Sequence, residues 1–143
     1  MKGNAGAGVM ETRKRLMSHG LKCVQQIALL RIWSGLKAPG AVPDISALSA
    51  EHLGRARDSI ALCDVVDAPK GQRYLLRYAG SQLQNAYGGE VVGKFIDEVV
   101  PANSWSSKLP GYDHVARAKE PHFCTLAFRR DNEADVLYER LLL

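Results

Sequence analysis

Apolar side chains recur at helical spacing between residues 9 and 36. Steps of three and four residues bring side chains to one face of an α-helix. Two apolar groups follow these steps: Met17, Leu21, Val24 and Ala28, and then Leu29, Ile32, Trp33 and Leu36. The pattern predicts an amphipathic helix over residues 9–36, whose apolar face covers either its own domain or a second copy of the chain.

Glycine and proline mark the boundaries of this helix. Residues 1–8 are small and glycine-rich, which predicts a disordered tail. Residues 37–44 contain two prolines and a glycine, so they predict a loop and an internal boundary. Residues 37–143 are then expected to form one domain, which begins with a short helix over 45–53 capped by Asp44 or Ser46.

Two pairs of β-prone segments follow, separated by a helical block. Residues 59–66 and 73–79 enclose a Pro/Gly loop and predict a hairpin in which alternation places Tyr74, Leu76 and Tyr78 on one side. Three helices are expected next: 80–87, 94–99, and one from Asn103 or Ser104 to Ala118 that Pro110-Gly111 restarts or bends. Residues 122–129 and 134–143 predict the last two strands. This order predicts an α+β fold, with an antiparallel sheet carrying helices on one face behind the N-terminal amphipathic helix.

Several of these segments share sequence features with a known protein family. Trp33, Leu36 and Pro43 precede the first strand segment, and the run 74–80 is a strand segment that ends on a glycine. Spaced glycines follow at Gly80, Gly88 and Gly93. With these features the chain resembles the PAS sensory domain, and in particular a group of small PAS-domain proteins common in alphaproteobacteria.

The resemblance implies a five-stranded sheet, and the sequence supplies four strand segments. Compared with that family the chain is expected to lack the fifth strand, and Leu141, Leu142 and Leu143 would leave an exposed apolar strand at its end. We expect either a fragment or a sheet that another chain completes.

Composition and charge narrow the class of protein. The chain has 143 residues, 46% hydrophobic and 24% charged, which fits one globular domain. Three widely spaced cysteines argue against a disulfide framework and fit the cytoplasm. No apolar run reaches the ~18–20 residues of a membrane span. The net charge of +4 is concentrated in the first 37 residues, where seven basic side chains stand against one acidic. We interpret that segment as a solvated helix face, so neither nucleic acid nor a membrane is the expected partner.

The sequence offers little catalytic or metal-binding chemistry. His122 and Cys124 share one side of a strand and amount to half a metal site, and no closely spaced set of four ligands occurs. No third group orients a Cys–His pair. We therefore expect a non-enzymatic protein without a metal or a resident cofactor.

A ligand pocket, if one exists, would lie between the sheet and the central helices, and its candidate side chains equally suit an ordinary core. These candidates are Tyr78, Tyr87, Phe95, Trp105, Phe123, Thr125 and Tyr138. In haem-binding PAS domains a histidine on the corresponding helix ligates the iron, and the resemblance makes His114 the candidate here.

The leading hypothesis is a sensory or regulatory PAS module in signal transduction that acts by protein–protein contact, as a homodimer with an unidentified signalling partner protein. Its expected dimer interface comprises Met17, Leu21, Val24, Ala28, Ile32 and Trp33. The alternative is a small-molecule or haem sensor in which the pocket itself is the function.

Overall fold

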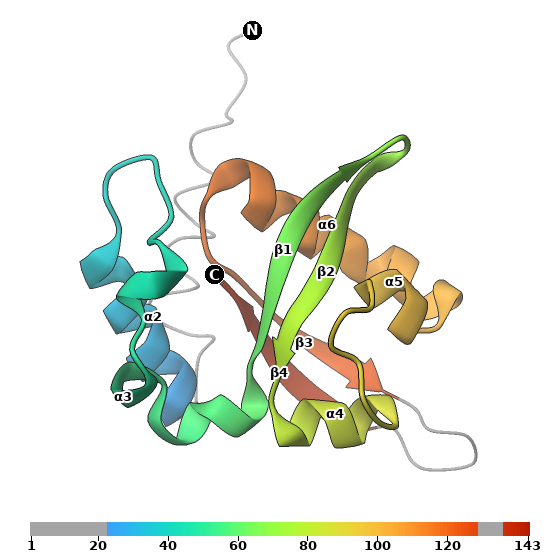
Figure 1. Ribbon diagram of the computed structural model, residues 1–143, viewed down its shortest axis with the longest axis horizontal. Helices are drawn as coiled ribbons and strands as arrows, with labels where there is room; N and C mark the ends of the chain where they lie inside the picture. The colour runs from blue at the N-terminus through green and yellow to red at the C-terminus, as the bar shows by residue number, and fades with distance from the viewer. Residues whose placement is uncertain (1–22, 129–135) are drawn as a thin grey trace, which may run out of the picture.

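The computed structural model describes residues 23–128 and 136–143, and it confirms a mixed α+β fold (Figure 1). The described elements are α2 (Val24–Leu36), η2 (Ile45–Ala47), α3 (Ala50–Leu53), η3 (Gly54–Ser59), β1 (Ala61–Ala68), β2 (Gly71–Ala79), α4 (Ser81–Tyr87), α5 (Ile96–Val99), α6 (Ala102–Ala118), β3 (His122–Phe128) and β4 (Val136–Leu142). The predicted tail over 1–8, the predicted helix over 9–22 and the turn over 130–133 lie outside the described residues.

The strands form two antiparallel hairpins. β1 pairs with β2 and β3 pairs with β4, and among the described strands no pairing joins one hairpin to the other. The structure therefore has two small sheets in place of the single sheet that the sequence predicted. At the edge of β4 the Gln26 side-chain amide of α2 donates to the Glu139 carbonyl at 3.2 Å. That carbonyl is thereby engaged by a side chain instead of a neighbouring strand.

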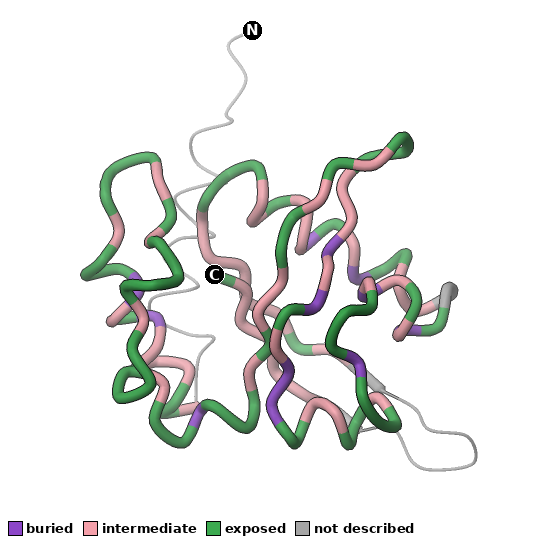
Figure 2. The backbone as a smooth tube through the Cα atoms, in the orientation of Figure 1, coloured by how far each residue is buried: buried purple, intermediate pink, exposed green. Residues whose placement is uncertain are grey.

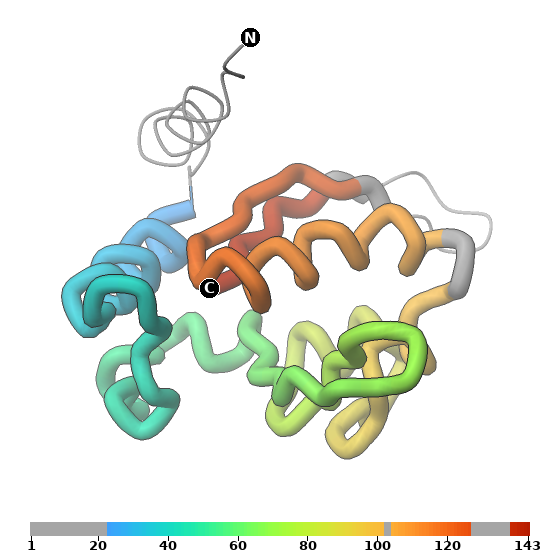
Figure 3. The backbone as a smooth tube through the Cα atoms, turned by 90° about the horizontal axis from the view of Figure 1, so that it is seen from above, coloured from blue at the N-terminus to red at the C-terminus, as the bar shows by residue number. Residues whose placement is uncertain are grey.

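Helix α6 runs between the two hairpins and packs against both (Figures 1 and 3). It meets β2 where the Trp105 ring stands edge-on to Tyr74, with centroids 6.2 Å apart. It meets β4 where the Arg140 guanidinium lies 4.9 Å from the centre of the Tyr112 ring. The space enclosed by α6 and the two hairpins is called the interior below.

One cluster of buried residues lies on β2, on α5 and beside them (Figure 2). They are Tyr74, Leu76, Ala79, Val91, Ile96 and Val100. Leu76 is the most buried of them, at 1% exposed. Burial of one such large apolar side chain stabilises the fold by roughly 1.5–3 kcal/mol.

Two predicted helices differ in detail from the structure. The helix expected over 45–53 is split into η2 and α3, because Asp44 caps the first piece and Ser49 caps the second. Helix α6 continues through Pro110 without restarting. Pro110 is exposed, so the missing backbone N–H falls on the solvent side of the helix.

Candidate functional site

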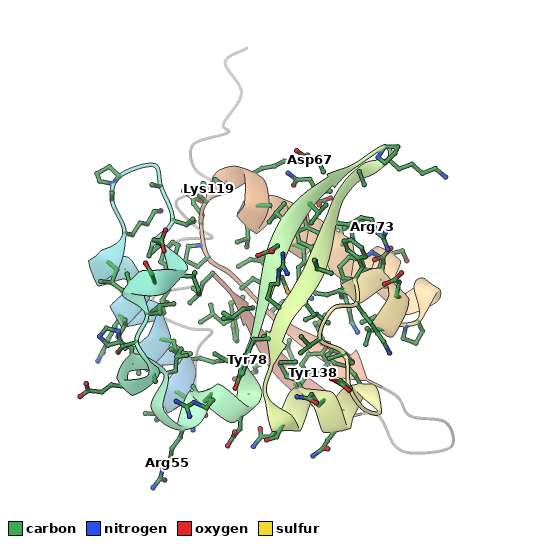
Figure 4. The ribbon with its side chains drawn as sticks, in the orientation of Figure 1. Arg55, Asp67, Arg73, Tyr78, Lys119 and Tyr138 are labelled. Carbon is green, nitrogen blue, oxygen red and sulfur yellow. The ribbon has the colours of Figure 1, made fainter. Side chains whose placement is uncertain are left out.

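The inner face of the first hairpin is set by an irregularity in β2. Cys63 pairs with Leu76 and Leu62 pairs with Tyr78, which leaves Arg77 as an extra residue between them. One extra residue reverses the alternation of side chains. Leu76 and Tyr74 therefore face the core, whereas Tyr78 faces away and donates to the Arg57 carbonyl of η3 at 2.9 Å (Figure 4). The interpretation that Tyr74, Leu76 and Tyr78 share one side was wrong because of this bulge.

The second hairpin is regular and presents alternate residues to α6. Cys124 pairs with Arg140 and Leu126 with Tyr138, so these four side chains share one face. Arg140 contacts the Tyr112 ring, which identifies this face as the inner one.

Phe123 and Thr125 lie on the opposite face of that hairpin. Their partners there are Leu141 and Glu139, and Glu139 lines a groove together with residues of α2. Phe123 and Thr125 therefore do not share a cavity with Tyr138.

An aromatic cluster occupies the β2 side of the interior. Tyr74, Trp105 and Tyr112 are in mutual contact, with the Trp105 and Tyr112 centroids 5.1 Å apart and the Tyr74 and Tyr112 centroids also 5.1 Å apart. The Tyr74 hydroxyl donates to Asp113 at 2.5 Å. Of the predicted pocket residues, Trp105 belongs to this cluster and packs against the core.

Basic and phenolic side chains occupy the β4 side of the interior. We call Tyr87, Lys108, Tyr112, Tyr138 and Arg140 the Lys108–Arg140 cluster. Lys108 is only 7% exposed, and its Nζ lies 5.9 Å from the centre of the Tyr138 ring. Arg140 approaches α6 at Gly111, where a Cβ would come within 2.7 Å of the guanidinium. A glycine at this position therefore lets the guanidinium lie against the helix.

The pKa values in this cluster reflect low solvation. Burial raises the pKa of Tyr112, and it also raises the pKa of Tyr87 and of Tyr138. Burial, and secondarily the charge of Arg140, lowers the pKa of Lys108. The phenols are therefore neutral at physiological pH, and the two basic side chains dominate the local charge.

Two further expected site residues lie outside the interior. The Arg73 guanidinium stacks 3.7 Å from the centre of the Phe95 ring and pairs with Asp97 at 3.0 Å (Figure 4). Phe95 thus belongs to a surface cluster at the edge of β2. His114 is exposed, with its ring centroid 6.0 Å from that of His122. It lines a groove of about 430 Å³ formed by α6 residues alone.

The expected dimer interface is only partly exposed. Trp33 is 5% exposed, so its side chain already packs inside the single chain. Val24 is 79% exposed, Ala28 is exposed and Ile32 is half-buried. Met17 and Leu21 lie outside the described residues.

A second groove, of about 330 Å³, separates α2 from the end of η3 and from β4. Gln26, Leu29, Ala56, Ile60 and Glu139 line it, among others. The buried Gln26 Oε1 has no hydrogen-bond partner among the described residues. The groove therefore offers one free acceptor at the junction of helix and strand.

Lys108 and Arg140 were not predicted as site residues. Lys108 sits between Trp105 and Tyr112 at steps of three and four, which places it on the apolar stripe of its helix. Arg140 stands two residues after Tyr138 and so shares its strand face. Both signals are present in the sequence, but a basic side chain is ordinarily assigned to the surface.

Comparisons with known proteins give no match: no family model, curated protein or solved structure is significantly similar to this chain. Among the described residues, none of the helices has both the length and the apolar character needed to cross a lipid bilayer. The same part of the chain contains no group of three or more His, Cys, Asp or Glu side chains placed to hold a metal ion.

Proposed function

We propose that the protein is a non-enzymatic sensory or regulatory module of the PAS type, which acts by protein–protein contact as a homodimer. In this proposal α2 is the contact element. The two hairpins and the helices between them form the body that α2 packs against. A signal acts by favouring one arrangement of α2 on that body over another.

The observation that carries the proposal is the division of α2 into a buried and an exposed apolar face. Leu30 and Trp33 are buried against the body, whereas Val24 is 79% exposed and Ala28 is exposed. These two exposed side chains lie four residues apart on one face of α2, which begins at Val24 with Cys23 as its extended N-cap. The upstream residues of the predicted interface, Met17 and Leu21, lie outside the described residues. A row of apolar side chains along one helix suits the same row on a second copy, since two identical faces bury each other around a twofold axis.

The tie between α2 and the body adds a means of transmission. Gln26 donates to the Glu139 carbonyl of β4, and the Lys37 ammonium donates to the Lys119 carbonyl at the end of α6. A displacement of α2 changes both contacts, so an event at the dimer interface reaches β4 and α6 together.

A matched pair of substitutions on α2 tests the proposal. Val24→Glu places a charge on the contact face, and Gln25→Glu places the same charge on the neighbouring exposed position. We expect Val24→Glu to weaken dimerisation at least tenfold, measured by light scattering after size-exclusion chromatography, and Gln25→Glu to leave it within about twofold. Equal effects of the two substitutions would contradict a contact face at Val24.

A second candidate function is small-molecule sensing in the interior, and the buried Lys108–Arg140 cluster favours it. A core without a ligand seldom retains basic side chains. The haem form of this candidate has less support, because His114 is exposed on a groove made by α6 alone. A purified sample without a Soret band would eliminate that form.

A further inference from the structure

The interior contains two basic side chains and no described acidic partner for either. The ion pairs of the described residues join Arg73 to Asp97 and Glu98, and Arg77 to Asp64. None of them involves Lys108 or Arg140. The buried Arg140 Nε also has no hydrogen-bond partner among the described residues.

The groups around these two cations do not neutralise them. Tyr112 and Tyr138 offer ring faces, at 4.9 Å from the guanidinium of Arg140 and 5.9 Å from the Nζ of Lys108. His122 is close to Arg140, and burial together with that charge lowers its pKa, so it is a neutral neighbour. Cation–π contacts compensate only part of the free energy lost when a charge leaves water.

The nearby acidic side chains are engaged elsewhere or face away. Asp113 accepts the hydrogen bond of Tyr74, and Glu139 lies on the opposite strand face from Arg140. Among the described residues the interior therefore holds two cations without an acidic partner, and the Nε of one of them, Arg140, is buried without a hydrogen bond. Such an arrangement is stable when an anion from solution completes it, as basic side chains do in phosphate and carboxylate sites.

We propose that the Lys108–Arg140 cluster is a binding site for a small oxyanion, a carboxylate or a phosphate. The guanidinium of Arg140 is planar and can donate two parallel hydrogen bonds to such a group, and the Lys108 ammonium adds a point charge. Tyr87, Tyr112 and Tyr138 supply aromatic walls and hydroxyl donors. The inference rests on the ligand-sensing candidate function and is independent of the contact face on α2.

The test is the thermal stability of the full chain with added oxyanions. Sodium succinate and sodium phosphate are the probes, neutral succinamide is the uncharged counterpart, and sodium chloride equalises the ionic strength. Lys108→Met removes the buried charge, and Lys70→Met removes the same charge from the exposed β1–β2 turn. We expect succinate, phosphate or both to raise the Tm of the wild type and of Lys70→Met by several degrees, and to leave that of Lys108→Met unchanged. Which probe acts distinguishes a carboxylate site from a phosphate site.

The Lys108→Met protein without added anion provides an independent readout. If the charge lacks a partner, its removal leaves the Tm equal to or above that of the wild type. A large fall in Tm would mean that the chain supplies its own counterion, and would overturn the proposal.

Three further results would also overturn it: no Tm shift with either oxyanion, an equal shift with succinamide, or a shift retained in Lys108→Met. A neutral small molecule bound to the purified protein, detected by native mass spectrometry, would in that case leave ligand sensing intact while the oxyanion site is lost.

Discussion

The Tyr74 hydroxyl donates a hydrogen bond to Asp113 Oδ1 at 2.5 Å, and so links β2 directly to α6. Tyr74 is 3% exposed, and its ring also contacts Trp105 and Tyr112. A single side chain thus holds the first hairpin to the helix that also contacts the second.

Removal of this hydroxyl is expected to destabilise the fold. Hydrogen bonds to charged groups contribute about 1.5–3 kcal/mol, so Tyr74→Phe should lower the free energy of unfolding by about 1.5 kcal/mol in urea titrations. Tyr78→Phe is the matched control, because its hydroxyl bonds to the uncharged Arg57 carbonyl at an exposed site. A loss for Tyr78→Phe as large as that for Tyr74→Phe would contradict this role of Asp113.

Because of Tyr74, we also expect the free energy of unfolding to depend on pH in the alkaline range. Burial raises the pKa of Tyr74, and the hydrogen bond to Asp113 raises it further. The folded state therefore favours the neutral phenol. This contribution is complete below the unfolded pKa of about 10 and is lost as the pH rises through the folded value. Between about pH 9 and 11, the free energy of unfolding should fall more steeply for the wild type than for Tyr74→Phe, and parallel curves would exclude this explanation.

Two glycines predict opposite effects of an added methyl group. A Cβ at Gly80 would collide with the Arg57 carbonyl oxygen and with the Asp58 backbone, whereas a Cβ at Gly35 would meet nothing within 4 Å. Gly80→Ala should therefore destabilise the protein by at least about 2 kcal/mol, because backbone atoms must move. Gly35→Ala, in α2, should stabilise it by roughly 0.5–1 kcal/mol through helix propensity. Thermal unfolding of both variants checks the pair, and a Gly80→Ala protein as stable as the wild type would show that this contact is misplaced.

Cys63 is predicted to be an unreactive thiol. Burial raises its pKa to about 11, with a smaller contribution from Asp64. The thiolate is the reactive form, so little of it is present at pH 7.5. A short iodoacetamide pulse followed by peptide mapping should label Cys63 far less in the folded protein than in urea. Comparable labelling in the two conditions would contradict its burial in the interior.

The sequence predicted where the helices and strands lie along the chain better than it predicted which of their side chains face the core. The segments expected over 59–66, 73–79 and 80–87 appear as β1, β2 and α4 with small changes at their ends. The extra residue at Arg77 carried no sequence signal, and it turned Tyr78 away from the core. In β3, apolar residues occupy both faces, so alternation could not show that Phe123 faces away from Tyr138.

Helix α2 presented a similar ambiguity. Its apolar residues form more than one stripe, and either could have been the buried one. The structure buries Leu30 and Trp33 and leaves Val24 and Ala28 exposed. Which face a helix buries depends on the surface that it meets, and periodicity alone does not contain that information.

The proposed function requires that this chain works as a dimer through α2, and the mass of the protein in solution tests that requirement most directly. Sedimentation equilibrium should be measured over a range of concentrations, from low to high micromolar. We predict a concentration-dependent approach to twice the chain mass of 15.7 kDa. A mass that stays at 15.7 kDa throughout the range would contradict it.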